Sequence, residues 1–198
     1  MKMKTHGATT PLLLFVWASI AQSAWGADLY KLDTSHTRVG FMVRHLVISK
    51  VRGEFKQYDA TILLDASDVT KSSLEGTIQV TSVDTGNEKR DNHLRTPDFF
   101  DVENYPTITF KSKRIEKNGE QYVMIGDFTM HGVTKEIELP FAITPLMTHR
   151  DKTRFGFSAE LEINRQDYGV AYSKIADNGG LVVSDKVIIE IDGEAIKQ

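Results

Sequence analysis

The sequence contains no cysteine. The fold can therefore have no disulfide bridge, and no thiol is available as a nucleophile or as a metal ligand. The chain must be stabilised by its own hydrophobic core. With 198 residues it is long enough to form one.

The sequence also lacks a run of basic residues. It has 24 lysines and arginines against 27 aspartates and glutamates, which gives a formal net charge of −3. Nucleic-acid-binding domains usually carry a dense basic patch, because they must neutralise phosphates. We therefore expect no nucleic-acid partner.

The one extended apolar run is too short to cross a membrane. It covers Leu12–Ala21, whereas a transmembrane helix needs roughly 20 apolar residues. Two lysines precede the run, and the small residues Ala24 and Gly26 follow it, which is typical of a secretory signal peptide. We expect residues 1–26 to be a cleaved signal peptide and 27–198 to be one exported domain that does not span a membrane. Export without disulfides favours the bacterial periplasm.

No sequence motif of a hydrolase or a metalloenzyme is present. There is no G-x-S-x-G motif, and none of the six histidines has H-x-H or H-x-x-E-H spacing. Asp33, Ser35 and His36 are close in the sequence, but we interpret them as turn residues with capping roles. We predict no catalytic residue, no metal site and no cofactor.

Alternating apolar and polar residues predict β-strands along most of the chain. Val39, Phe41 and Val43 share one face of such a strand, for example, and Met42 and Arg44 share the other. The expected strands are Leu29–Asp33, Thr37–His45, Val51–Tyr58, Ala60–Asp65, Leu74–Val83, Thr107–Ile115, Tyr122–Met130, Lys135–Thr144, Arg154–Ile163 and Lys186–Ile191. Turn residues separate them, notably 34–36, 117–119 and 131–133. Many short strands joined by turns indicate an all-β antiparallel barrel or sandwich rather than an α/β fold.

One charged segment, residues 84–106, interrupts this pattern. We call it the excursion. Its only credible helix lies near Glu88–Leu94. Pro97 marks the point where the helix becomes loop, and Pro106 the point where the loop becomes strand. A helical insertion in an all-β chain is expected to lie at an end of the sheet structure, where it can act as a lid or a mouth.

Large apolar residues lie on one face of several strands and at positions 99 and 100 of the excursion. They could fill a packed core or line a cavity, and residue identity alone does not decide between the two. The candidate residues are Val39, Phe41, Val43, Phe55, Ile78, Phe99, Phe100, Phe110, Phe128, Phe141, Phe155 and Phe157.

Five basic side chains are candidates for the polar mouth of such a cavity: Arg44, His45, Arg90, His93 and Arg95. On a helix, Arg90 and His93 lie on one side, and an arginine guanidinium is well suited to bind a phosphate or a carboxylate. The alternative is that these residues pair with the acidic residues of the excursion and fix it to the rim of the barrel.

Several motifs, in order and with their spacing, give the chain a strong resemblance to the YceI-like family. They are Asp33–Phe41 (DTSHTRVGF), Val43–Leu46 (VRHL), Val51–Phe55 (VRGEF), Ser82–Asn87 (SVDTGN), Arg90–Arg95 (RDNHLR), Asp98–Val102 (DFFDV), Tyr105–Phe110 (YPTITF), Gly126–Lys135 (GDFTMHGVTK) and Val183–Val187 (VSDKV). The resemblance implies an extended, lipocalin-like antiparallel barrel with one short helical excursion at its end. It also implies a long apolar tunnel that holds a polyisoprenoid or another long-chain lipid, often in a homodimer, and no enzymatic activity.

The resemblance favours a lined cavity over a packed core. We therefore expect a non-catalytic carrier or store for a polyisoprenoid or an isoprenoid quinone-like lipid. Two alternatives remain open: sequestration of apolar toxins or antibiotics in the same cavity, and an enzyme that acts on a lipid head group through His45 or His93.

Overall fold

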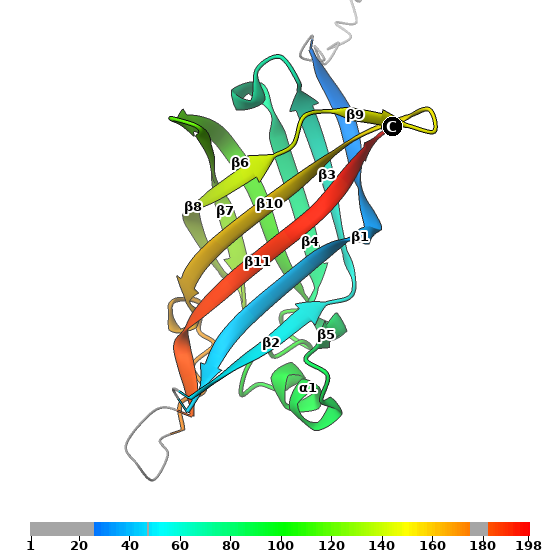
Figure 1. The fold of residues 1–198 in the computed structure, drawn as a ribbon. Helices are drawn as coiled ribbons and strands as arrows, with labels where there is room; N and C mark the ends of the chain where they lie inside the picture. The colour runs from blue at the N-terminus through cyan, green and yellow to red at the C-terminus, as the bar shows by residue number, and fades with distance from the viewer. Residues whose placement is uncertain (1–25, 47, 175–181) are drawn as a thin grey trace, which may run out of the picture.

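The fold is taken from a computed structural model that describes residues 26–46, 48–174 and 182–198 (Figure 1). The expected signal peptide, residues 1–26, lies outside the described residues apart from Gly26. Among the described residues, no helix is long and apolar enough to cross a membrane.

Antiparallel strands make up most of the described chain. They are β1 (Ala27–His45), β2 (Ser49–Phe55), β3 (Tyr58–Asp65), β4 (Ser73–Gln79), β5 (Val83–Asp84), β6 (Thr107–Asn118), β7 (Gln121–Met130), β8 (Val133–Ile143), β9 (Met147–His149), β10 (Lys152–Asn164) and β11 (Val183–Lys197). The one α-helix in this part of the chain is α1 (Glu88–Arg95), and three single 3₁₀ turns cover Val69–Lys71, Val80–Ser82 and Arg165–Tyr168.

Eight of these strands close into a barrel. In spatial order they are β1, β3, β4, β6, β7, β8, β10 and β11, and β11 pairs back onto β1 to complete the ring. The closing pair extends from Tyr30 opposite Lys197 to His45 opposite Val183. Each strand of the ring pairs with a neighbour on both sides over at least part of its length, with the shortest contact between β8 and β10. The predicted all-β barrel is confirmed.

The long strand β1 corrects one expectation. Residues 34–36 were expected to form a turn between two strands, but β1 runs without interruption from Ala27 to His45. Asp33 pairs with Glu194 and Arg38 with Asp192, so the residues between them oppose a single residue of β11 as a bulge. Pairing with β11 on both sides of the bulge keeps the segment in the sheet, whereas local sequence alone favours a turn.

The two halves of β1 pair with different strands. Its first half pairs with β3 from Ala27 to Lys31, and its second half pairs with β2 from Val39 to His45. Strands β2 and β3 therefore diverge, and β5 continues the sheet beyond β2. The expected strand 74–83 is divided between β4, a 3₁₀ turn and β5, and Tyr58 begins β3 instead of ending β2.

Helix α1 covers the barrel end at which β2 and β3 diverge (Figure 1). The Asn87 side chain caps its N-terminus by accepting a hydrogen bond from the Arg90 backbone N–H, and the helix ends at Thr96, before Pro97. The buried carboxylate of Asp91 accepts hydrogen bonds from the backbone N–H and the hydroxyl of Thr85. These contacts fix the helix to β5, which confirms the predicted helical excursion at the end of the barrel.

Two tight hairpins, one at each end of β7, confirm the turn predictions for this part of the sheet. Gly119, with φ of +63°, joins β6 to β7. His131 and Gly132, with φ of +51° and +73°, join β7 to β8. Two consecutive residues with positive φ suit the right-handed twist of the flanking strands, and glycine at the second position adopts this conformation without steric cost.

Candidate functional site

The barrel encloses an apolar cavity of about 650 Å³. A volume of this size lies within the range of small-molecule sites. All twelve apolar residues named from the sequence lie on its wall: Val39, Phe41, Val43, Phe55, Ile78, Phe99, Phe100, Phe110, Phe128, Phe141, Phe155 and Phe157. The inner face of the barrel therefore lines a cavity and does not fill the interior.

A cluster of buried side chains packs the barrel end opposite α1, where both ends of the described chain lie (Figure 1). Tyr30 and Ala195 are fully buried in this cluster, together with Ile62, Leu64 and Phe155. The rings of Tyr30 and Phe155 meet edge to face with their centroids 5.1 Å apart. A larger cluster of buried side chains packs against the excursion at the other end. The polar wall residues His45, Arg90 and His93 also lie at that end, so we infer that the mouth of the cavity is there.

Three aromatic side chains meet at the α1 end of the cavity. The His93 ring contacts Phe99 and Tyr172 edge to face, with centroids 5.1 and 5.3 Å apart, and Phe99 lies 4.6 Å from Tyr172. All three residues line the cavity. They join α1 and the loop after it to the segment that follows the last 3₁₀ turn, and together they form an aromatic rim at the mouth.

Three of the five predicted head-group residues, His45, Arg90 and His93, line the cavity. Arg90 is already engaged, since it donates from Nε to the Thr85 hydroxyl at 2.7 Å and from a terminal nitrogen to the Thr85 carbonyl at 2.8 Å. His93 Nε2 lies 2.8 Å from a carboxylate oxygen of Asp98. Both residues therefore stabilise the excursion internally. Contact with a ligand stays a prediction.

The other two predicted residues, Arg44 and Arg95, are not on the cavity wall. Arg44 lies between Val43 and His45 in β1, so the alternation of the strand turns it outward, where it lines a second, outer pocket with Lys50 and Lys186. Arg95 donates to the carbonyls of Thr81 and Val83, each at 2.8 Å. The contacts of Arg95 fit the structural alternative, although its partners are backbone carbonyls and not the acidic residues expected.

Sequence reasoning missed the second arginine on the cavity wall, Arg165. It is only 4% exposed and lies directly after β10. The strand alternation contained a signal for it, because Phe155, Phe157, Ala159, Leu161 and Ile163 all line the cavity and 165 is the next position in that series. The predicted strand ends at Ile163, two positions before Arg165.

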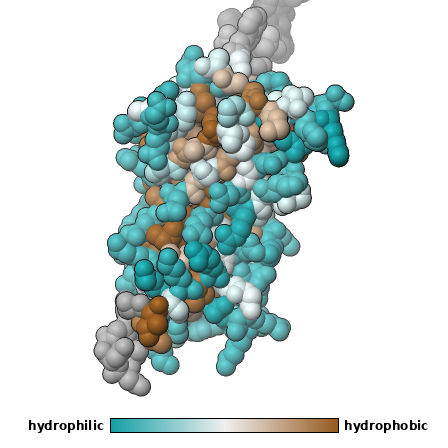
Figure 2. Space-filling model, viewed as in Figure 1, coloured by the Kyte–Doolittle hydropathy of each residue, from teal (hydrophilic) through white to brown (hydrophobic). Residues whose placement is uncertain are grey.

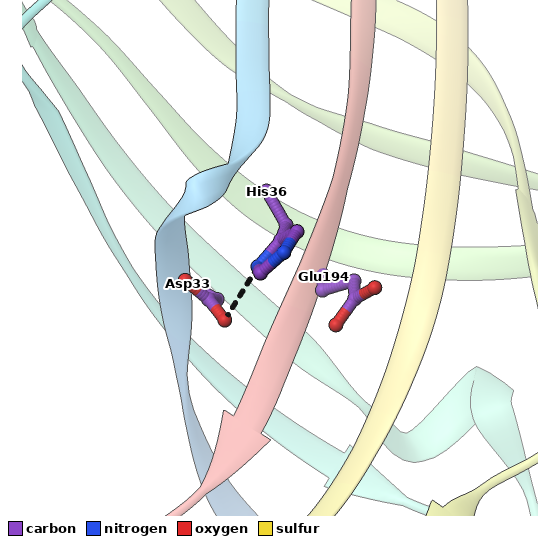
Figure 3. Close-up of side chains that lie close together, drawn as sticks. All are labelled: Asp33, His36 and Glu194. Carbon is purple, nitrogen blue, oxygen red and sulfur yellow. Dashed lines mark hydrogen bonds and ion pairs between the residues drawn. The ribbon is translucent and has the colours of Figure 1, made fainter.

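On the outside of the barrel, Asp33, His36 and Glu194 come together at the β1 bulge (Figure 3). Within the described ranges they are the one set of three potential metal ligands whose donor atoms lie within 4.8 Å of one another. Each already has a protein partner: His36 Nδ1 lies 3.0 Å from Asp33, and Arg154 donates to Glu194 at 3.0 Å. Hydrogen bonds from Ser35 and His36 lower the pKa of Asp33 to about 2. These contacts account for the cluster as a brace across the bulge.

Polar and charged side chains cover much of the face shown in Figure 2, with apolar residues exposed between them. The most exposed large apolar residue of the described chain is Ile48, at 81%, in the turn between β1 and β2. The turn precedes Ser49 and follows His45, which both line the cavity. The apolar Ile48 side chain therefore lies next to the mouth.

Comparison with known proteins gives a consistent result. The model of the YceI-like domain matches residues 30–195. Protein YceI of Escherichia coli O157:H7 is 35% identical over 199 aligned residues, covering 98% of each chain. The crystal structure of the Campylobacter jejuni YCEI protein is 39% identical, with a TM-score of 0.68 over 84% of this chain and 96% of that one.

A more distant structure has the same fold. A polyisoprenoid binding domain from Saccharophagus degradans superimposes with a TM-score of 0.62, covering 85% of this chain and 98% of the other. The two sequences are only 17% identical, so this likeness concerns the fold alone.

Proposed function

The chain belongs to the YceI-like domain family, and from that premise we propose that it binds a long-chain apolar ligand inside the barrel without altering it chemically. The ligand class that we propose is a polyisoprenoid or an isoprenoid quinone-like lipid.

The observation that carries this proposal is the cavity of about 650 Å³ with a mainly aliphatic and aromatic wall. An apolar chain that leaves water for such a wall gains about 25 cal/mol per Å² of surface buried. A long chain therefore supplies most of the binding free energy, and polar groups at one end set its orientation. The polyisoprenoid binding domain from Saccharophagus degradans has the same fold, which supports this choice of ligand class.

We propose a carrier or storage role in the bacterial periplasm, reached through cleavage of residues 1–26. Sequestration of apolar toxins or antibiotics would use the same cavity. Displacement of a bound lipid by candidate antibiotics separates the two roles, because a carrier should prefer its lipid by a wide margin.

The proposal of a non-catalytic role has its own test. An enzyme acting on a head group at the mouth would depend on His45 or His93, which both line the cavity. We expect the bound lipid to be recovered unchanged after long incubation with the purified protein. A converted head group, and loss of that conversion in His45→Ala or His93→Ala, would establish an enzyme instead.

The decisive experiment is native mass spectrometry of the protein purified from its own host, followed by solvent extraction of the bound material. We expect one long-chain lipid per cavity. The same spectrum tests the homodimer that we also propose, since it distinguishes one chain from two. A protein that carries no lipid and binds none when long-chain lipids are added would contradict the proposed function.

A further inference from the structure

Arg165 combines two properties that no other charged residue in the described part of the chain combines. It is buried, with 4% of its surface exposed, and it lines the cavity. The other two buried charged residues, Asp65 and Asp91, are not on the cavity wall. His45 and His93 are on the wall but exposed, and Arg90 is half-buried.

The hydrogen bonds of Arg165 leave part of its guanidinium without a protein acceptor. Nε donates to the Ser184 carbonyl at 3.0 Å, and the two terminal nitrogens donate to the Val170 carbonyl at 2.6 Å and to Asp185 at 2.8 Å. A guanidinium has five N–H groups. Three therefore have acceptors among the described residues, which leaves one N–H on each terminal nitrogen for another partner.

The charge of Arg165 is also only partly balanced. Its one carboxylate partner is Asp185, whose side chain is 34% exposed and also accepts a hydrogen bond from Gln166 at 3.0 Å. Burial lowers the pKa of Arg165, and the Asp185 charge raises it. A buried cation is costly unless it is paired and hydrogen-bonded. An anion that reaches Arg165 from the cavity therefore gains binding free energy from the interaction.

The position of Arg165 suits a head group whose chain extends into the barrel. It follows β10 and donates to Ser184 in β11, next to the pair of His45 and Val183 at the α1 end. The side chains beside it on the wall, Ile163, Val170 and Val187, are apolar. Arg165 thus lies near the α1 end of the cavity, and the apolar wall extends from it toward the opposite end of the barrel.

We propose that Arg165 binds an anionic oxygen head group, a carboxylate or a phosphate, at the end of the long-chain ligand. This inference rests on the proposed function and adds to it the chemistry of the head group. A guanidinium with two remaining donors, one on each terminal nitrogen, matches two oxygens of such a group.

Matched ligand pairs test the head-group chemistry directly. The dissociation constants of the wild-type protein are measured at pH 8 for oleate against oleyl alcohol and for geranylgeranyl phosphate against geranylgeraniol. A charge-assisted hydrogen bond predicts that at least one anion binds about 10- to 100-fold more tightly than its alcohol. The two pairs also distinguish a carboxylate ligand from a phosphate ligand.

Two variants with opposite expected effects identify the residue. Arg165→Gln should remove the preference for the anion and leave the alcohol affinity unchanged. Asp185→Asn keeps Arg165 but removes its counter-charge, so the preference should rise about two- to fivefold. Lys186→Gln, which removes a positive charge from an exposed side chain paired with Glu162, is the control and should change neither constant.

The outcomes separate the two proposals. If neither the oleyl nor the geranylgeranyl ligand binds, whether as the anion or as the alcohol, the proposed function fails. If these ligands bind but neither anion binds more tightly than its alcohol, the role of Arg165 is overturned while the proposed function stands. The same holds if Asp185→Asn leaves the preference for the anion unchanged. Because Asp185→Asn leaves Arg165 in place, the test remains conclusive even if Arg165→Gln fails to fold.

Discussion

The rings of Phe99 and Tyr172 lie with their centroids 4.6 Å apart, and this contact connects the excursion to the chain segment that precedes β11. Both rings also contact His93, and all three line the cavity at its α1 end. A ligand that enters or leaves at this end must pass them. The aromatic rim is therefore expected to control exchange.

We expect Phe99→Ala to speed ligand release by about 2- to 10-fold, because an aromatic pair contributes about 0.5–1.5 kcal/mol beyond its buried area. Stopped-flow displacement of a fluorescent fatty acid measures the release rate. Tyr122→Ala is the control, since it removes a ring stacked on Phe141 beside the β6–β7 turn and Tyr122 does not line the cavity. Equal release rates in Phe99→Ala and the wild-type protein would show that ligands use another route.

A side chain added at Gly76 should fill the cavity without disturbing the barrel. Gly76 lines the cavity, and a Cβ atom there would meet its nearest neighbours, Leu74, Asp59 and Ala60, at 3.7–3.9 Å, which is ordinary contact. We expect Gly76→Leu to keep the melting temperature and to weaken binding of long-chain ligands at least tenfold, as judged by titration calorimetry.

The matched control for this variant is Gln79→Leu, which adds the same side chain at an exposed position of the same strand. Gln79 is not on the cavity wall, so its replacement should leave ligand binding unchanged. If Gly76→Leu binds as well as the wild-type protein, ligands do not occupy the middle of the barrel.

Two tyrosines that differ in their hydrogen bonds should respond differently to loss of the hydroxyl. Tyr30 is fully buried and its hydroxyl has no partner among the described residues, whereas the Tyr58 hydroxyl donates to the Thr37 carbonyl. Tyr30→Phe should leave the free energy of unfolding unchanged or raise it by up to about 1 kcal/mol. Tyr58→Phe should lower it by about 1 kcal/mol. Chemical denaturation measures both, and a large loss in Tyr30→Phe would indicate a buried water at that site.

Acid should weaken the brace across the β1 bulge. Hydrogen bonds from Ser35 and His36 lower the pKa of Asp33 to about 2, below the value of about 4 for a free aspartate. A lowered pKa stabilises the fold above pH 4, and this contribution disappears as the pH falls from about 4 through about 2. The unfolding free energies of the wild-type protein and Asp33→Asn should therefore differ at pH 7 and converge toward pH 2. Glu120→Gln, in the β6–β7 turn, should show no such convergence.

Local sequence patterns were sufficient for much of the fold. The alternation of Val39, Phe41 and Val43 and the similar series from Phe155 to Ile163 predicted which side chains face inward, because neighbouring residues of a strand point to opposite faces. Pro97 likewise marked the C-terminal limit of the helix, because proline disfavours a helical conformation for the residue before it.

Features that depend on distant pairing were decided only by the tertiary structure. Whether residues 34–37 form a turn or a bulge depends on β11, about 160 positions away in the chain, and so does the closure of the barrel. The openness of the interior follows from the strand number and the closure, which no local pattern contains. Arg165 shows the same limit. The sequence indicated that Arg165 continues the inward-facing series of β10. Its burial against Ser184 and Asp185 exists only once β10 and β11 are paired.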